Sequence, residues 1–388
     1  MKVLHVTAGI SQRQGGSKVL LGMCRELQRA GVDAQIASTN ADTRGVLDVP
    51  LNCAVDVDGV PVYHFASPWA RRYGFSPRLS RWLKEHVAEQ DVVHVHGLFC
   101  YTTMPAIWQA SKNGIPYIIR PMGELAPWCL QQGALKKQTY LRWVGRDYLE
   151  NAAAIHCTAE EEKRNVDRLG FRLNSTVIPL AMDEADFARA PAGNFRRRYP
   201  AIGESKIILF LSRIDPVKGL ELLVAALARL SCQRTDFMLV IAGEGEPGYE
   251  RRIRSAVAKQ GLSERALFLG FVRGSQKAEL LADADIFVLP SHHENFGLAI
   301  AEAMAAGVPV IISDQVNIQR EVAEAEAGIV TARDPREMVN AFDRLLSDPG
   351  RRHSMGANAR HLAETRFSWP VVVPQLTRLY NSIAQGRR

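Results

Sequence analysis

Residues 284–313 constrain the fold more than any other stretch, because they read as a buried strand, a polar loop, a helix and a second buried strand. The apolar run Ile286–Leu289 is short enough for a strand buried on both faces, and Pro290 ends it. A helix pattern begins near Gly297, and the apolar run Val308–Ile312 follows it. Two strands joined through a helix predict neighbours in a parallel sheet.

The same alternation runs along the whole chain of 388 residues. Strand patterns recur at residues 3–8, 33–37, 60–65, 91–96, 117–120, 153–158, 206–211, 237–242 and 267–269. We therefore predict an α/β protein with mostly parallel sheets that carry helices on both faces. The length is large for one core, so we predict two domains, residues 1–190 and residues 200–365, on either side of the polar stretch 183–200.

Two carboxylates bracket the turn after Leu289. Glu294 lies in the loop, and Glu302 follows eight residues later inside the helix. We expect both to face the crevice beyond the carboxyl end of the strand. Backbone N–H groups of Phe296, Gly297 and Leu298 would be free at the helix start, a place that favours an anion such as phosphate. A plainer explanation stays open, because the helix dipole alone favours acids at a helix start.

The pattern Glu-x7-Glu encloses Phe-Gly-Leu and continues as Glu-Ala-Met-Ala-Ala-Gly-Val-Pro-Val-Ile. It resembles the signature of the retaining nucleotide-sugar glycosyltransferases of family four. The resemblance implies the GT-B fold, in which two doubly wound Rossmann-like domains face a central cleft. The first domain would bind the acceptor and the second the donor, and a final helix over 371–388 would pack back on the first domain. Glu294 would lie by the donor sugar, beside Asn295, and Glu302 would bond the ribose hydroxyls.

Two cations lie in a Pro-containing turn after the strand at 206–211, namely Arg213 and Lys218. Together with the N–H groups of the next helix they suit a diphosphate. The resemblance implies that they are the diphosphate pair of the family, and that the main chain of Phe271 and Val272 contacts the base.

The first domain offers three further candidates. Gly15 and Gly16 follow the first strand, where the backbone of a glycine can approach a ligand closely, although a simple turn is an equal explanation. His96 ends the strand at 91–96 and is followed by Gly97. The resemblance implies that His96 touches the donor sugar and the acceptor, while His94 is assigned to packing.

The loop 120–128 resembles a motif of bacterial family members that build surface polysaccharides. It either places Glu124 and Trp128 over a sugar or is an ordinary capping loop.

Departure of a nucleoside diphosphate requires stabilisation of negative charge, either by a metal or by fixed cations and helix dipoles. We expect no Asp-x-Asp metal site next to a strand and no metal cofactor, so Arg213, Lys218 and the amides near Gly297 and Leu298 would supply it. The six cysteines are scattered without metal-ligand spacing. Reduced thiols and an N-terminus that enters a strand at once predict a cytoplasmic protein.

The net charge is +7. Basic and aromatic residues interleave in the amphipathic stretch Ala134–Glu150 and in an earlier set: Trp69, Arg71, Arg72, Tyr73, Phe75, Arg78, Arg81, Trp82 and Lys84. A solvated face is one explanation, and peripheral contact with an anionic membrane or a lipid pyrophosphate is the other. No nucleic-acid-binding motif accompanies the charge, so we expect no nucleic-acid partner.

These features predict a retaining, metal-independent hexosyltransferase. The donor would be a UDP-sugar, glucose first, and the acceptor a growing, lipid-linked oligosaccharide of the envelope or of exopolysaccharide, at the inner face of the plasma membrane. Two alternatives stay open: a nucleotide-sugar epimerase of the same fold, and a non-catalytic nucleotide-sugar-binding protein. A nicotinamide oxidoreductase is disfavoured, because the N-terminal turn lacks its glycine fingerprint.

Overall fold

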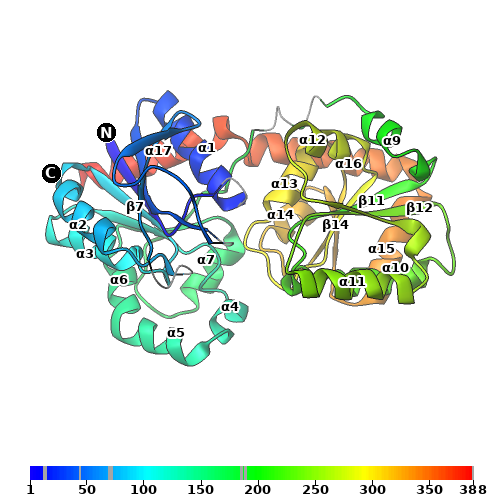
Figure 1. Cartoon of the computed structure of the whole chain (residues 1–388), viewed down its shortest axis with the longest axis horizontal. Coiled ribbons are helices and arrows are strands. Elements are labelled where there is room, and N and C mark those ends of the chain that lie inside the picture. The colour runs from blue at the N-terminus through cyan, green and yellow to red at the C-terminus, as the bar shows by residue number, and fades with distance from the viewer. Residues whose placement is uncertain (12–14, 43–44, 69–72, 184–186, 188–189, 387–388) are drawn as a thin grey trace. The chain divides into compact units, whose positions relative to one another are not determined.

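The computed structural model describes residues 1–11, 15–42, 45–68, 73–183, 187 and 190–386 (Figure 1). The chain divides into two compact units. Unit 1 contains Met1–Ala181 and Trp369–Arg388, and unit 2 contains Met182–Ser368. The boundary between Ala181 and Met182 thus precedes the polar stretch 183–200. Five residues of that stretch lie outside the described part. In the described part, no helix is both long and apolar enough to cross a membrane.

One large sheet forms the centre of unit 1. Its strands, in spatial order, are β10 (Ser175–Val177), β9 (Ala154–Cys157), β8 (Tyr117–Arg120), β7 (Val92–His96), β1 (Lys2–Thr7), β2 (Asp33–Thr39), β6 (Val60–Phe65) and β5 (Ala54–Val57). Neighbours are parallel except β5 and β6, which are antiparallel. A small antiparallel pair, β3 (Ala41–Asp42) and β4 (Gly45–Val46), lies outside it.

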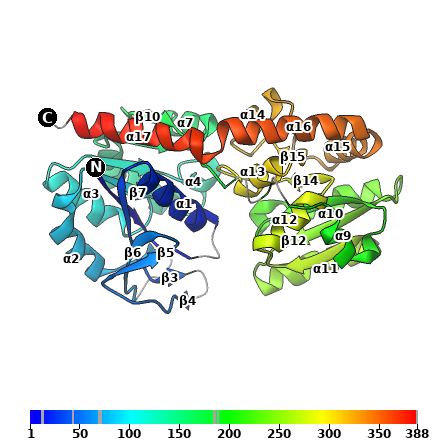
Figure 2. The ribbon, with the colours of Figure 1, turned by 90° about the horizontal axis from the view of Figure 1, so that it is seen from above.

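Helices cover this sheet. They are α1 (Gly15–Arg29), α2 (Pro77–His86), α3 (Thr103–Lys112), α4 (Pro127–Gln131), α5 (Ala134–Tyr140), α6 (Arg146–Glu150), α7 (Glu160–Asp167) and α17 (Trp369–Gln385). One core contains Leu4 and Val6 of β1 with residues of α2 and α3. Because strand side chains alternate, His5 points to the other face, where α17 contacts β7 and packs against α1 (Figure 2).

Unit 2 contains a six-stranded sheet in which every neighbouring pair is parallel. The spatial order is β13 (Ala266–Gly270), β12 (Phe237–Ala242), β11 (Lys206–Leu211), β14 (Ile286–Leu289), β15 (Val310–Ser313) and β16 (Gly328–Thr331). Its helices are α9 (Asn194–Arg198), α10 (Leu220–Leu230), α11 (Pro247–Lys259), α12 (Gly274–Asp283), α13 (Leu298–Ala305), α14 (Gln319–Glu324), α15 (Pro335–Ser347) and α16 (Pro349–Arg366). The predicted parallel α/β architecture is confirmed in both units.

Each sheet reverses its winding direction at one place. In unit 1 the first strand, β1, lies between β2 and β7, and in unit 2 β11 lies between β12 and β14. Ligands of doubly wound sheets bind beyond the carboxyl ends of the strands at such a switch point. The functional candidates His96 and Glu294 follow or end the strands β7 and β14, so each belongs to a switch point.

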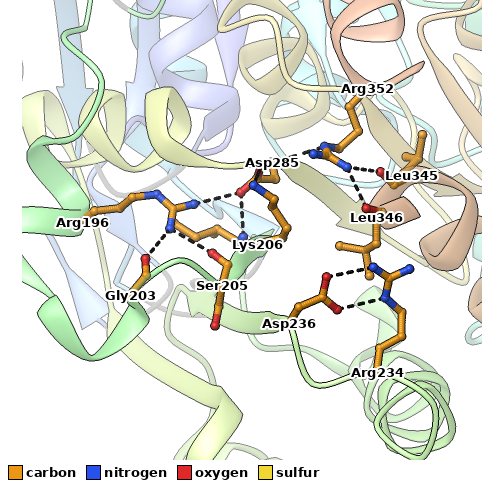
Figure 3. Close-up of polar contacts among 11 residues, drawn as sticks. Arg196, Gly203, Ser205, Lys206, Arg234, Asp236, Asp285, Leu345, Leu346 and Arg352 are labelled. Carbon is orange, nitrogen blue, oxygen red and sulfur yellow. Dashed lines mark hydrogen bonds and ion pairs between the residues drawn. The ribbon is translucent and has the colours of Figure 1, made fainter. Parts of the chain in front are cut away.

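An ionic cluster lies at the opposite, amino end of the unit 2 sheet (Figure 3). Asp285, directly before β14, accepts from Arg196 of α9 at 2.9 Å and from the backbone N–H of Ile207 in β11 at 2.9 Å. Lys206 and Arg352 approach the same carboxylate at 3.7 and 4.0 Å. This cluster fastens the chain entering unit 2 to the start of its two central strands.

Candidate active site

The loop after β14 is held by its neighbour, the loop after β15. The backbone N–H of Glu294 donates to the carbonyl of Gln315 at 3.2 Å, and Asn317 N–H donates to the Glu294 carbonyl at 3.0 Å. The Ser313 hydroxyl donates to the Ser291 carbonyl at 2.6 Å. The backbone around Glu294 is therefore fixed from both sides.

The carboxylate of Glu294 pairs with the ammonium of Lys218. Lys218 ends a short 3-10 turn, Pro216–Lys218, and its side chain is only 10% exposed. The next residue, Gly219, has φ +73°, and an added Cβ there would lie 2.1 Å from the carbonyl oxygen of Pro290. Only glycine allows this close approach, which brings the Lys218 turn against the loop of Glu294.

Arg213 lies apart from this ion pair. Its side chain is 71% exposed, and its guanidinium contacts Asp215 at 3.3 Å. The structure thus brings Lys218 and Glu294 together but leaves Arg213 facing solvent, where an incoming anion has access to it.

The start of α13 is shaped as the sequence predicts. Gly297 is its N-cap residue with φ +79°, and a Cβ there would lie 2.5 Å from Ile300 Cδ1. The first N–H groups, those of Leu298 and Ala299, have no acceptor within the helix, whereas Ile300 N–H donates to the Gly297 carbonyl at 2.8 Å. Phe296 is buried, with its ring against Phe367, and Asn295 accepts from the Asn317 amide at 3.1 Å.

Glu302 is placed differently from Glu294. Its side chain is 6% exposed, and its Oε1 accepts from the Lys277 ammonium at 2.6 Å. Lys277 belongs to α12, directly after the connection that contains Phe271 and Val272. Phe271 is exposed and Val272 is buried, so of these two side chains only that of Phe271 faces solvent.

In unit 1, His96 lies in a buried group of histidines. Its Nε2 is 2.9 Å from His5 Nδ1, and the two rings are stacked. Behind them, His94 Nδ1 contacts the Tyr380 hydroxyl of α17 at 2.8 Å, and His94 Nε2 lies 3.4 Å from His156 Nδ1. Burial, and next the Arg120 guanidinium, hold the pKa of His96 well below its usual value, and burial lowers the pKa of His5 and His156 to about 3.

Three of these rings also have the geometry of a metal site. The ligand atoms of His5, His94 and His96 lie within 4.8 Å of one another, and no other His, Cys, Asp or Glu group of the described residues does this. However, Arg120 is paired with His96 across the sheet and is itself fully buried, and its charge disfavours every added cation. The arrangement suits neutral rings better than a metal ion.

Glu124 supports the loop after His96. Its carboxylate accepts from the N–H groups of Leu98 and Phe99, at 2.5 and 3.1 Å, and burial raises its pKa. This contact favours the capping explanation of the loop 120–128 over a carboxylate turned toward a sugar. Trp128 keeps 38% of its surface exposed.

One expectation needs correction. The explanation of Gly15 and Gly16 as a simple turn is wrong, because both are the first, exposed residues of α1. The nearest atom to a Cβ on Gly16 is Met122 Cε at 3.7 Å. The residues directly before them, 12–14, lie outside the described part.

Acidic pairs of the form Asp-x-Asp do occur beside strands, although not as an evident metal site. One of them is Asp283 and Asp285. It precedes β14 instead of following it, and both carboxylates are occupied: Asp283 accepts from the N–H groups of Gly193 and Arg196, and Asp285 belongs to the ionic cluster. The pair therefore lies at the amino end of β14, the end opposite to the loop of Glu294.

Comparison with known families decides the class. Residues 14–181 match the family model described as "Glycosyl transferase 4-like domain", and residues 193–362 match the model described as "Glycosyl transferases group 1". The chain belongs to this glycosyltransferase family. The family that the sequence pattern resembles is thereby confirmed.

Relatives and solved structures agree with this assignment. The glycosyltransferase is 29% identical to the phosphatidyl-myo-inositol mannosyltransferase of Mycolicibacterium smegmatis over 81% of this chain and 77% of that protein. Sucrose-phosphate synthase from Thermosynechococcus elongatus superimposes with a TM-score of 0.80 at 23% identity, covering 99% of both chains. Anabaena Alr3699/HepE, in complex with UDP-glucose, gives 0.78 at 20% identity over 98% of this chain and 100% of that chain.

These structures show that the fold is GT-B. A further match, to an uncharacterized glycosyltransferase of Methanocaldococcus jannaschii at 33% identity, spans 48% of this chain and 47% of that protein.

Several residues of this glycosyltransferase escaped the sequence analysis. Lys277, Asn317 and Arg120 all contact or adjoin the predicted site residues. Their partners lie on other elements. No local motif surrounds Lys277 or Asn317, whereas Arg120 opens the motif of the loop 120–128, which does not show its place beside His96. For Arg120 the pairing of β7 with β8 was the one available signal, because it puts Arg120 beside His96.

Proposed function

We propose that this glycosyltransferase moves a hexose, glucose first, from a UDP-sugar to an acceptor hydroxyl with retention of anomeric configuration and without a metal cofactor. The observation that carries the proposal is the Lys218–Glu294 ion pair, next to the uncapped start of α13 at the switch point of unit 2. A cation for phosphate and a carboxylate for sugar hydroxyls thus occur side by side. The solved complex of HepE with UDP-glucose supports this donor.

The chemical step needs the diphosphate to leave as negative charge builds on it. Lys218, exposed Arg213 and the N–H groups of Gly297 and Leu298 would stabilise that charge. The acceptor oxygen would bond to the anomeric carbon on the face from which the diphosphate departs, and the leaving phosphate oxygen would take the acceptor proton. No protein carboxylate then needs to form a covalent intermediate.

Other residues would recognise the remaining parts of the donor. Glu294 and Asn295 would hold sugar hydroxyls, Glu302 the ribose, and the main chain of Phe271 and Val272 the base. From unit 1, His96 would meet the sugar and the acceptor as a neutral ring, in agreement with its lowered pKa. Gly15 and Gly16 would approach the phosphates with their backbone.

The binding test is calorimetry with UDP, GDP, ADP and dTDP in EDTA, on the wild type and on Lys218→Ala and Glu302→Ala. UDP should bind most tightly, with the same affinity when Mg²⁺ replaces EDTA, and both variants should bind it about 10-fold or more weakly. Lys259→Ala, on the far end of α11, is the matched control. If none of the four nucleotides binds, the proposed function is wrong.

Turnover separates the enzyme classes that share this fold. A glycosyltransferase releases UDP in proportion to acceptor, whereas an epimerase converts the UDP-sugar without acceptor and a binding protein leaves it unchanged. Incubating UDP-glucose with and without a lipid-linked oligosaccharide, followed by analysis of sugar and nucleotide, distinguishes all three.

We further propose a lipid-linked oligosaccharide as acceptor, reached at the inner face of an anionic membrane. The segment α5–α6 supports this, because Leu135 and Trp143 are 79% and 74% exposed beside the exposed Arg142 and Arg146. In the earlier set of basic and aromatic residues, Trp69, Arg71 and Arg72 lie outside the described residues. The mannosyltransferase relative is named for a lipid, phosphatidyl-myo-inositol.

Vesicle sedimentation tests this surface. The double variant Arg142→Glu/Trp143→Ser should bind vesicles of 30% phosphatidylglycerol about 10-fold or more weakly than the wild type, since each basic residue contributes about 1 kcal/mol near such a surface. The control variant Arg251→Glu, at an exposed position of α11, should bind the vesicles as tightly as the wild type. Equal binding of the double variant and the wild type would refute the membrane contact.

A further inference from the structure

Lys277 is a buried lysine whose contacts the sequence did not reveal. Its side chain is 16% exposed, its ammonium donates to Glu302 Oε1 at 2.6 Å, and it lies 5.0 Å from the centre of the Phe187 ring. A covered ammonium requires a fixed counter-charge, because burial disfavours the charged form. The carboxylate and the aromatic face together hold a long, flexible side chain in one position.

The position of Lys277 along the chain joins two parts of the proposed donor site. Residues 271–273 connect β13 to α12, and Lys277 lies in the first turn of that helix. Glu302 lies in the second turn of α13. The ion pair therefore ties the connection proposed to contact the base to the carboxylate proposed to contact the ribose.

The pairing also selects one oxygen of Glu302. A carboxylate has two oxygens that accept hydrogen bonds. Lys277 occupies Oε1, so Oε2 is left for an incoming hydroxyl. Without Lys277, a carboxylate that is 6% exposed loses its counter-charge and the contact that fixes its orientation. The acceptor is then no longer held in place.

We propose that Lys277 is a positioning residue for ribose recognition: it holds Glu302 as an oriented anion, so that selection of a ribonucleotide depends on both residues. The inference rests on the proposed function, in which Glu302 binds the ribose hydroxyls. Lys277 itself touches no substrate. Its removal should therefore cost affinity for ligands that possess the hydroxyl, and leave ligands that lack it nearly unchanged.

The test compares UDP with 2′-deoxy-UDP and 3′-deoxy-UDP by calorimetry. The wild type should prefer UDP about 10- to 100-fold over at least one of the deoxy analogues, which is the usual effect of a hydrogen bond to a charged group. Lys277→Met should bind UDP about 10-fold or more weakly and the deoxy analogues within about 3-fold of the wild type. The ratio of the affinity for UDP to that for the deoxy analogue then falls toward one.

Coupling to Glu302 gives a second measurement. Glu302→Ala should lose the same preference, and Lys277→Met/Glu302→Ala should bind UDP no more weakly than Glu302→Ala alone. Lys277→Arg keeps the charge and should retain most of the preference. Lys259→Met removes an exposed lysine of unit 2 and should match the wild type.

The outcomes separate the inference from the function on which it rests. If the wild type discriminates and a folded Lys277→Met retains the full preference, the inference is wrong and the function stands. Equal losses for UDP and the deoxy analogues would also overturn it, because they indicate general damage to unit 2. A wild type that binds UDP without preference overturns the inference alone, whereas a wild type that does not bind UDP overturns both. Circular dichroism checks folding, and Lys277→Gln, with the same expectation, replaces a Met variant that does not fold.

Discussion

The two switch points of this glycosyltransferase use polar residues in opposite ways. In unit 1, His5, His96 and Arg120 lie on the strands themselves, beneath helices, and are almost completely buried. In unit 2, Lys218 and Glu294 lie in loops beyond the strand ends. The same sheet order thus positions the polar group of unit 1 inside a core and that of unit 2 at the rim, meaning the loops beyond the carboxyl ends of the strands.

The difference determines which groups carry charge. Burial holds the pKa values of all four clustered histidines below their usual range, so these rings are neutral at pH 7 and act through hydrogen bonds. In unit 2 the covered charges of the site form the ion pairs Lys218–Glu294 and Lys277–Glu302. The first pair joins the turn of Lys218 to the loop of Glu294, and the second joins the helices α12 and α13, so these charges meet outside the sheet.

The largest effect should come from breaking the rim pair. Lys218→Met removes the cation that would stabilise the leaving diphosphate and leaves Glu294 without its partner. We expect kcat/KM for UDP-glucose to fall about 10²- to 10³-fold, as for loss of one transition-state donor. The measurement is steady-state UDP release. A fall of less than 10-fold would mean that catalysis does not depend on the charge of Lys218.

A large effect on stability should come from acid, and it should concentrate in unit 1. His5 and His156 have pKa values near 3 when folded and about 6.5 when unfolded, so between these values the unfolded chain binds more protons. Stability present above pH 6.5 is therefore lost as the pH falls. Each ring contributes about 1.4 kcal/mol per pH unit, or about 4 kcal/mol for both between pH 6.5 and 5.

Urea unfolding at pH 7 and pH 5 measures this loss. All six tryptophans lie in unit 1, so their fluorescence follows that unit alone, while circular dichroism follows both. The fluorescence midpoint should shift more than the transition of unit 2, in which burial lowers the pKa of His292 but His353 and His361 are exposed. Equal shifts for both units would contradict the comparison.

The smallest effect should come from the edge of the histidine group. His156 Nε2 lies 2.8 Å from the Ile178 carbonyl, which only accepts, so His156 Nδ1 accepts from His94 Nε2 and His94 Nδ1 accepts from the Tyr380 hydroxyl. Tyr380→Phe removes that donor and should lower the free energy of unfolding by about 1 kcal/mol. The KM for UDP-glucose should not change. A changed KM would show that the buried group affects donor binding.

The sequence analysis predicted those features of the fold and the site that a local sequence pattern encodes. The strands appear as apolar runs, and Gly297 with the acids around it marks the start of α13. Lys277 was missed because its partner, Glu302, lies 25 residues away on another helix. Neither helical nor strand periodicity predicts such a contact. The histidine group was missed because strand register, not spacing, places His5 and His156 near His96.

The contacts at the amino end of the unit 2 sheet also define where the chain can be cut. A fragment that begins at Lys206, the first residue of β11, would retain the whole sheet. It would nevertheless lose α9, and with it the N–H groups that satisfy Asp283 and the guanidinium of Arg196 that pairs with Asp285. Two partly buried carboxylates beside β14 would then lack these partners. The smallest autonomous form of unit 2 therefore begins before Gly193, so its natural end is set by two aspartates and not by the first strand.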